Sequence, residues 1–411
     1  MHILLVRQHF SPPSAAGSSR PFEMAKRWVA NGHNVTILTS TTKFSESFEL
    51  NSKINTFNLE GIDIVAVNVP YKNSFSFFRR LTSFLKFAYL CIKASKYVNA
   101  VDVVLGSSTP LTVAIPAVQI SRRHNCPMVF EVRDLWPEMP IAVGALRNPF
   151  LKLIAGRLER YAYQNATRII ALSPGMASGV VSCGYPERKV TVIPNASDIE
   201  RFQQGKISAQ DFFESFPFLQ SKKIVLYAGT IGKLNGVDYL AEIAKETLAS
   251  NPEVVFVVVG SGGREEVVRR AAKRMEVLGN NFFMLGEFPK EDIPTLFQLA
   301  SICTSLFINI PEMEKNSANK FFDALAAQRP IMINYSGWQR QLIEQNDIGL
   351  FVPPKDPAEA SRRLLSLLDR PDLIKEMGGR SGRIGEERFS MNTLSSRALE
   401  VLKTAVKVHG Q

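Results

Sequence analysis

The sequence contains few cysteines and no long apolar run, and both absences exclude classes of protein. Its 411 residues include four cysteines that stand far apart and form no Cys-x-x-Cys pair. A disulfide framework, a zinc finger and a redox motif are therefore not expected, and the cysteines are predicted to be reduced core thiols. No run of about eighteen uncharged apolar residues occurs, so no membrane-spanning helix is predicted. The first residues lack the pattern of a secretory signal, and we expect a cytoplasmic protein.

Several ligand-binding motifs are also missing. The chain has no Gly-x-Gly-x-x-Gly fingerprint, no Asp-x-Asp pair and no His/Asp cluster with the spacing of metal ligands, so we expect neither a cofactor nor a metal. It has no signature of a helix-turn-helix, zinc-finger or RNP module, so nucleic acid is not an expected partner. The net charge of +11 nevertheless favours an anionic partner. The anionic partners that remain as candidates are phosphorylated small molecules and an acidic membrane face.

What the sequence does contain is a regular alternation of short buried strands and apolar-periodic helices. This alternation predicts the α/β class, with two doubly wound, Rossmann-like parallel-sheet domains at residues 1–205 and 222–389. Residues 199–221 show no strand pattern and are expected to form the linker. The predicted strands are 2–6, 35–39, 101–105, 128–132, 169–172 and 190–193 in the first half, and 224–228, 254–259, 282–285, 331–333 and 349–352 in the second.

The stretch 311–338 predicts a loop, a helix, a turn and a strand. Asn316 and Ser317 are residue types that cap helices, and they precede an apolar-periodic run. A helix start has free backbone N–H groups and a positive dipole end, so it can bind an anion, and Lys320 adds a full positive charge beside it. Asp323 lies one turn further on, where a carboxylate can accept hydrogen bonds from a sugar diol. The alternative is an ordinary capped core helix.

A second candidate anion site follows the predicted strand 224–228. Gly229, Thr230 and Lys233 belong to a glycine-containing loop between that strand and the next helix, which is a credible phosphate cradle. Because sheet packing also selects glycine, the loop by itself is weak evidence.

Polar residues in the first half follow strands whose carboxyl ends should meet at one sheet edge, where ligands bind in open α/β sheets. His9, Gly17 and Arg20 follow strand 2–6, and His9 and Arg20 could face the ligand, although a structural role for His9 is equally compatible. Arg133 and Asp134 follow strand 128–132 and would offer a cation for a phosphate and a carboxylate for a hydroxyl. A salt-bridged sheet edge is the alternative.

Residues 75–96 combine bulky aromatic and aliphatic residues with basic ones and contain no acidic residue. A helix here would have an apolar side and a basic side, which is the composition of an interfacial helix on an anionic membrane. The alternative interpretation is a helix that packs on the sheet and exposes its basic residues to water.

The motifs at 317–330, 130–138 and 229–237 together resemble those of family 4 glycosyltransferases of the GT-B fold, in order and over nearly the whole chain. The resemblance implies two domains facing each other across a cleft, with a final helix, 390–411, crossing back to the acceptor-side first domain. The expected catalytic residues are Asp134, Arg133, Lys233 and Lys320, of which Lys233 and Lys320 would stabilise the leaving diphosphate and Asp134 would orient the acceptor. His9 and Arg20 are expected on the acceptor side. The donor-binding residues implied are Gly17, Gly229, Thr230, Lys233, Glu314, Ser317, Ala318, Asn319, Lys320, Phe321 and Asp323.

The segment 130–138 resembles bacterial enzymes of O-antigen or capsule assembly, some of which transfer N-acetylfucosamine. That resemblance implies a retaining, metal-independent transfer from a UDP-sugar, a substrate rather than a cofactor, to a polyprenyl-diphosphate-linked saccharide. The enzyme would be peripheral on the inner face of the cell membrane, through residues 75–96. Two other classes remain: a non-hydrolysing UDP-sugar 2-epimerase, and a non-catalytic partner subunit that binds nucleotide sugar. The family's second acidic position is Lys315 here, which gives the partner subunit some weight.

Overall fold

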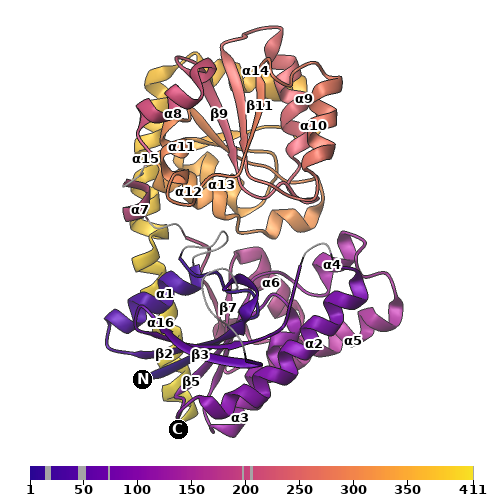
Figure 1. The fold of residues 1–411 in the computed structure, drawn as a ribbon, viewed down its shortest axis with the longest axis vertical. Coiled ribbons are helices and arrows are strands. Elements are labelled where there is room, and N and C mark those ends of the chain that lie inside the picture. Colours follow the sequence, from indigo (N-terminus) through magenta and orange to yellow (C-terminus); the bar gives the residue numbers. More distant parts are fainter. Residues whose placement is uncertain (14–19, 45–51, 73–74, 197–198, 204–206, 411) are drawn as a thin grey trace. The chain divides into compact units, whose positions relative to one another are not determined.

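The structure is a computed structural model that describes residues 1–13, 20–44, 52–72, 75–196, 199–203 and 207–410. Its contacts divide the chain into two units, Met1–Pro194 with Met391–Gln411, and Asn195–Ser390. Each unit is a sheet covered by helices (Figure 1). This confirms the predicted α/β class with two parallel-sheet domains.

The first unit has an eight-stranded sheet in the order β3-β4-β2-β1-β5-β6-β7-β8. All its neighbours are parallel except β3 and β4, which form an antiparallel edge. The strands are β1 His2–Val6, β2 Asn34–Ser40, β3 Ile54–Leu59, β4 Ile62–Val67, β5 Val103–Ser107, β6 Met128–Val132, β7 Arg168–Ala171 and β8 Val190–Val192.

The antiparallel pair β3–β4 was not predicted from the sequence. Glu60 and Gly61 join the two strands, and both have positive φ angles, 50° and 83°. Two such residues form the tight turn that suits the twist of a hairpin, and glycine adopts this conformation without strain. Strand β3 is only half-buried, because it lies at the edge of the sheet. Its weak apolar signal is typical of an edge strand.

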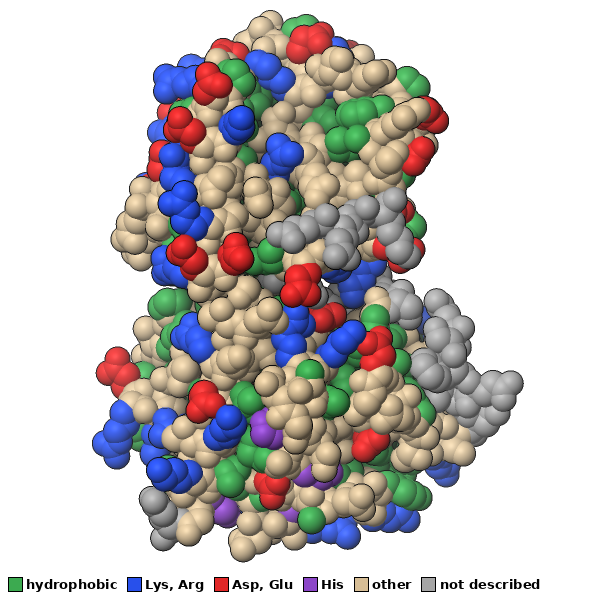
Figure 2. All heavy atoms as spheres, turned by 90° about the vertical axis from the view of Figure 1, so that its left-hand side faces the viewer, with side chains coloured by type: hydrophobic (Ala, Val, Ile, Leu, Met, Phe, Trp, Pro, Cys, Tyr) green, Lys and Arg blue, Asp and Glu red, His purple; other side chains and the backbone are tan. Residues whose placement is uncertain are grey.

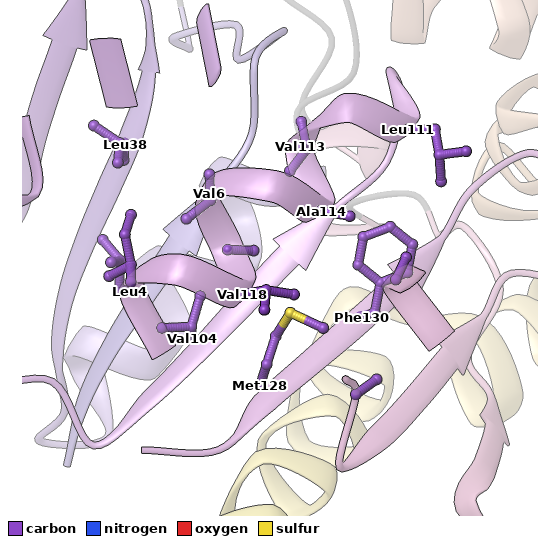
Figure 3. Close-up of a cluster of buried hydrophobic side chains, with 14 of the residues drawn as sticks. Leu4, Val6, Leu38, Val104, Leu111, Val113, Ala114, Val118, Met128 and Phe130 are labelled. Carbon is purple, nitrogen blue, oxygen red and sulfur yellow. The ribbon is translucent and has the colours of Figure 1, made fainter. Parts of the chain in front are cut away.

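Helices cover both faces of this first sheet. Helices α2 (Phe77–Ala94), α3 (Ala114–Arg123) and α5 (Pro149–Gln164) bury residues in one core cluster against the strands, part of which Figure 3 shows. Right-handed crossovers place α1 (Arg20–Ala30) on the opposite face, because its connection runs the other way along the sheet. The C-terminal helix α16 (Met391–His409) pairs with α1, and Trp28 Nε1 donates a hydrogen bond to the Ser395 carbonyl at 3.1 Å.

The second unit has a six-stranded, all-parallel sheet in the order β11-β10-β9-β12-β13-β14. Its strands are β9 Lys223–Ala228, β10 Val254–Val259, β11 Phe282–Gly286, β12 Ile302–Ser305, β13 Ile331–Ile333 and β14 Gly349–Phe351. Its main helices are α9 Val237–Leu248, α10 Glu265–Arg274, α11 Ile293–Leu299, α12 Asn319–Ala326, α13 Trp338–Asn346, α14 Pro357–Leu368 and α15 Pro371–Phe389. The predicted strands of this half all exist, within about one residue at each end.

The linker predicted at 199–221 is instead part of the second unit. It contains the short helices α7 (Ile199–Gln203) and α8 (Ala209–Ser215). Phe202 and Phe212 are buried in the second unit's core, so the described parts of this segment are packed against that unit. The phenylalanines of a segment without strand periodicity were the signal that it packs.

Among the described residues, no helix is both long and apolar enough to cross a membrane.

Candidate functional site

The candidate donor site of the second unit is built around Lys320, in the first turn of α12. Strands β9 and β12 are neighbours, so the loop after β9 and the segment from β12 to α12 leave the same sheet edge. The Lys320 side chain lies against Gly229, the residue that follows β9. A Cβ atom built on Gly229 would come within 2.8 Å of Lys320 Cε. Glycine at this position therefore lets the lysine side chain cross the end of β9.

Aromatic rings surround the same ammonium group. Lys320 Nζ lies 4.9 Å from the ring centroid of Tyr227 and 6.0 Å from that of Phe307. Burial lowers the pKa of Lys320 to about 8, although Asp323 one turn further along α12 opposes the shift. A positive charge held in a partly apolar setting is poorly hydrated. Such a group can form a strong charge-assisted hydrogen bond to an anion.

The start of α12 differs from the prediction in its capping residue. The N-cap is Ala318, which has no side chain able to cap, rather than Asn316 or Ser317. The Ser317 hydroxyl instead accepts a hydrogen bond from the Asn195 backbone N–H at 3.0 Å, and the Asn195 side chain donates to the Ser317 carbonyl at 2.6 Å. No side chain caps the amides at the start of the helix, which suits a site for an anion.

The other predicted donor residues differ in their exposure to solvent. Phe321 is buried in the core beneath α12 and supports the helix rather than a ligand. Asn319, Thr230 and Lys233 are exposed, and the Thr230 carbonyl accepts a hydrogen bond from the Tyr227 hydroxyl at 2.6 Å. Glu314 is exposed in the short 3-10 helix Pro311–Lys315, and its carbonyl lies against Gly337.

The first unit carries a buried cluster of charges where β1, β5 and β6 end. Glu131 lies at its centre, 5% exposed, and forms an ion pair with Arg20 at 3.1 Å. The Ser107 hydroxyl donates to Glu131 Oε2 at 2.5 Å and accepts a hydrogen bond from Arg7 Nη1 at 2.8 Å. Arg133 Nη1 lies 3.7 Å from the same carboxylate oxygen. Three guanidinium groups therefore converge on one carboxylate.

The pKa values of this cluster follow from burial and from the excess of positive charge. Burial alone would raise the pKa of Glu131, but Arg20, Arg133 and the Ser107 hydrogen bond outweigh it and hold that pKa at about 2. Burial and the neighbouring Arg133 lower the pKa of Arg7 to about 9. Among the described residues, the buried Arg133 Nη1 has no hydrogen-bond acceptor. The cluster can thus accommodate a further anion.

The predicted Asp134 lies beside this cluster. Thr109 donates a hydrogen bond to Asp134 Oδ2 at 2.9 Å. Burial nevertheless raises the pKa of Asp134 above its ordinary value, against the effects of Thr109, Arg133 and Arg7. A carboxylate with a raised pKa can accept or orient a hydroxyl proton, so the structure brings Arg133 and Asp134 together in a way that suits an acceptor hydroxyl.

The remaining predicted residues of the first unit are Arg20, His9 and Gly17, and the structure gives each a different setting. Arg20 is 2% exposed and donates to Glu131 and to the carbonyls of Ile193 and Pro194, so the geometry favours a structural role over the predicted acceptor contact. The His9 ring lies at a tilt with its centroid 4.5 Å from that of Tyr71, and burial beside Arg7 lowers the pKa of His9 to about 4. His9 is therefore neutral at pH 7. Gly17 lies outside the described residues.

Sequence reasoning missed several residues of both sites. Glu131 was readable as a charge inside the apolar strand 128–132, a position that requires a partner. Tyr227 was readable from alternation, because residues two apart on a strand share a face and Tyr227 precedes Gly229 by two. Arg7, Ser107 and Phe307 had no signal beyond their places at strand ends. Within the described residues, no group of three or more His, Cys, Asp or Glu side chains could hold a metal ion.

Comparison with known proteins identifies the class of protein. Residues 20–201 match the family model described as Glycosyltransferase Family 4, and residues 208–382 match that of Glycosyl transferases group 1. Together the two matches take in most of the chain. The Anabaena protein HepE, solved with UDP, aligns with a TM-score of 0.72 over 98% of this chain and 100% of its own, at 15% identity, and has also been solved with UDP-glucose. The fold and these matches define a glycosyltransferase of the predicted GT-B class.

The chain belongs to glycosyltransferase family 4. Its curated relatives are distant. Spore coat protein SA of Bacillus subtilis is 25% identical over 191 residues, 44% of this chain and 49% of that protein. The provisionally named colanic acid biosynthesis glycosyl transferase WcaI of Escherichia coli is 22% identical over 310 residues, 73% of this chain and 75% of that protein. The chain thus spans about half the length of the first relative and three quarters of the second.

Proposed function

We propose that this protein transfers a sugar from a UDP-sugar to the hydroxyl of a polyprenyl-diphosphate-linked saccharide, with retention of anomeric configuration. The observation that carries the proposal is the contact of Lys320 with Gly229, which holds a poorly hydrated ammonium group at the start of α12. The complexes of HepE with UDP and UDP-glucose support a UDP-sugar as the donor. An N-acetylated hexose or deoxyhexose is the donor sugar that the segment 130–138 favours.

In the proposed reaction, negative charge develops on the diphosphate as its bond to the anomeric carbon breaks. Lys320, Lys233 and the amides at the start of α12 would stabilise this charge, and so provide electrostatic catalysis by preorganised groups. The departing phosphate oxygen would take the acceptor proton, so a protein base is not required. Asp134 would then orient the acceptor hydroxyl, and Arg133 would bind an anionic group of the acceptor. The assignment to O-antigen or capsule assembly, at the inner face of the membrane, belongs to this proposal.

The test of this proposal is UDP release from a panel of UDP-sugars, with and without an extract of lipid-linked acceptors. Acceptor-dependent release from one donor is expected, and it would identify that donor. Interconversion of a UDP-sugar without acceptor would replace the proposal with a 2-epimerase. Nucleotide-sugar binding with no turnover under any condition would favour a non-catalytic partner subunit.

Donor binding should weaken as the pH rises above about 8. Lys320 has a pKa of about 8 in the free protein, and a bound diphosphate would raise that pKa because it stabilises the ammonium form. UDP affinity should therefore be constant near pH 7 and fall by up to about tenfold per pH unit above pH 8. Calorimetric titration with UDP between pH 6.5 and 9.5 measures this. Lys320→Arg, whose guanidinium stays charged, should remove the decline, and a flat wild-type profile would contradict the assignment.

A further inference from the structure

Large hydrophobic side chains that are exposed to solvent gather on two helices of the first unit. The described surface has nine such residues, and six of them belong to α2 and α5. The six are Phe78, Leu85 and Tyr89 on α2, and Phe150, Leu153 and Ile154 on α5. Single exposed hydrophobic residues are ordinary, whereas a cluster of them marks an interaction site.

On α2 the exposed residues form one stripe. Phe78, Leu85 and Tyr89 are spaced by seven and four residues, so they project from the same side of the helix, and Phe78 is 74% exposed. Basic side chains accompany the stripe. Lys93 Nζ lies 4.5 Å from the ring centroid of Tyr89, and the Arg79 guanidinium lies 3.9 Å from that of Phe75. The opposite side of the helix, which includes Phe87 and Cys91, is buried in the core.

On α5 the same pattern recurs over a shorter length. Phe150, Leu153 and Ile154 are spaced by three and one residues in the first half of the helix, and Phe150 is 65% exposed. Arg157 and Arg160 continue the exposed side in the second half. The only acidic residue of the helix, Glu159, is buried and accepts a hydrogen bond from the Tyr163 hydroxyl at 3.1 Å. The exposed side of α5 is therefore apolar and basic.

The two exposed sides lie on the same face of the sheet. Both α2 and α5 contact α3 and the short 3-10 helix Leu111–Val113, and Figure 1 shows the two helices close together. Buried residues of all three helices belong to one core cluster against the strands, so their outer sides point away from the same sheet face. We call the exposed sides of α2 and α5 the two-helix face.

Among the described residues, the basic residues of the two-helix face form no salt bridges, although Arg160 interacts electrostatically with the buried Glu159 beside it. No salt bridge in the described part of the chain involves Arg79, Lys86, Lys93, Lys152, Arg157 or Arg160 of these helices, or Lys96 and Arg147, which lie just outside their ends. Elsewhere on the surface, basic residues commonly pair with carboxylates, as Lys26 does with Glu60 and Arg340 with Glu344. Figure 2, which draws another side of the molecule, shows acidic and basic side chains interspersed.

We propose that the two-helix face is a membrane-docking surface in which α5 is a second insertion element beside α2. Exposed bulky residues among lysines and arginines that form no salt bridge in the described structure match an anionic lipid surface, in which the apolar groups enter the headgroup region and the cations contact lipid phosphates. A second copy of this chain fits less well, because two such faces would bring like charges together. The inference rests on the proposed peripheral membrane location through residues 75–96, and it adds α5. Two anchoring helices would fix the orientation of the first unit on the membrane.

The test measures sedimentation of the full chain with vesicles of phosphatidylcholine and phosphatidylglycerol, without nucleotide sugar or acceptor. The triple variant Phe150→Ser, Leu153→Ser, Ile154→Ser should lower binding at least about tenfold although α2 is unchanged, because three apolar groups no longer enter the lipid. Val408→Ser, which removes an exposed hydrophobic residue of α16, is the matched control and should bind like the wild type. The four substituted residues are all exposed, so thermal unfolding should be unaffected.

Three other results would overturn the inference. Equal vesicle binding by the α5 variant and the wild type would confine docking to α2. Equal binding to vesicles of phosphatidylcholine alone would remove the role of the basic residues. A wild-type dimer in solution that the α5 variant converts to a monomer would assign the face to a second copy. Because the assay contains no sugar substrate, none of these results bears on sugar transfer, which UDP release tests separately.

Discussion

Lys320→Ala should lower the rate of sugar transfer by about a thousandfold while the protein stays folded. If Lys320 neutralises the leaving diphosphate, its loss removes stabilisation that is greatest in the transition state, an effect of about 3–4 kcal/mol. The folded state should not suffer, because burying the ammonium is itself unfavourable, as its pKa of about 8 indicates. The measurement pairs steady-state UDP release with thermal unfolding of the same preparation.

Two variants make this result specific. Lys245→Ala, on the exposed side of α9 in the same unit, removes a lysine charge away from the site and should leave turnover unchanged. Lys320→Met keeps most of the apolar stem over Gly229 and Tyr227 but has no charge, so it should be as inactive as the alanine variant and at least as stable as the wild type. Near-normal turnover in Lys320→Met would remove Lys320 from the diphosphate site.

The sequence predicted most of the fold because the buried parallel strands are short, continuous apolar runs. Strands β1, β6 and β10 begin and end at the predicted residues. The buried strands β4 and β12 were nevertheless missed, and the other failures occurred where burial is partial. Strand β3 lies at a sheet edge. The short helices α7 and α8 bury few apolar residues, chiefly Phe202 and Phe212, so their helical periodicity is weak. A local pattern cannot reveal packing that depends on distant neighbours.

The candidate site was predictable in its positions but not in its contacts. Gly229 and Lys320 were predicted separately from local motifs. Only the fold shows that the absence of a side chain at Gly229 leaves room for the Lys320 side chain. Arg20 was predicted at the acceptor because it follows the loop at the carboxyl end of strand 2–6, an edge where ligands bind in open α/β sheets. No local signal indicated that Arg20 would form an ion pair with Glu131, which is more than a hundred residues away in the sequence. Pairing between distant charges requires the three-dimensional arrangement of the strand ends.

Glu131→Gln should destabilise the protein by about 3–5 kcal/mol, because it leaves the buried Arg20 guanidinium without a counter-charge. In a unit of this size such a loss corresponds to a decrease in Tm of about 10 °C. Glu60→Gln is the matched control, since Glu60 pairs with Lys26 at the surface and should contribute less than about 1 kcal/mol. Calorimetry or thermal circular dichroism of both variants measures the difference. A Glu131→Gln protein as stable as the wild type would show that the ion pair does not hold the strand ends together.

The same carboxylate should make the first unit sensitive to acid, and the sign follows from its pKa. The pKa of Glu131 is about 2 in the folded protein against an ordinary value of 4.5, so the folded state favours the ionised form. The stability from this ionisation is complete above about pH 4.5 and is lost as the pH falls toward 2. The Glu131→Gln variant has no such ionisation to lose. The difference in unfolding free energy between the wild type and this variant should therefore narrow as the pH falls from about 4.5 toward 2. Adding Arg20→Met to Glu131→Gln should restore part of the stability near pH 7, because one fewer buried guanidinium lacks a counter-charge, although Arg7 and Arg133 would still lack the carboxylate. It should not restore all of it, because the carbonyls of Ile193 and Pro194 would lose their donor.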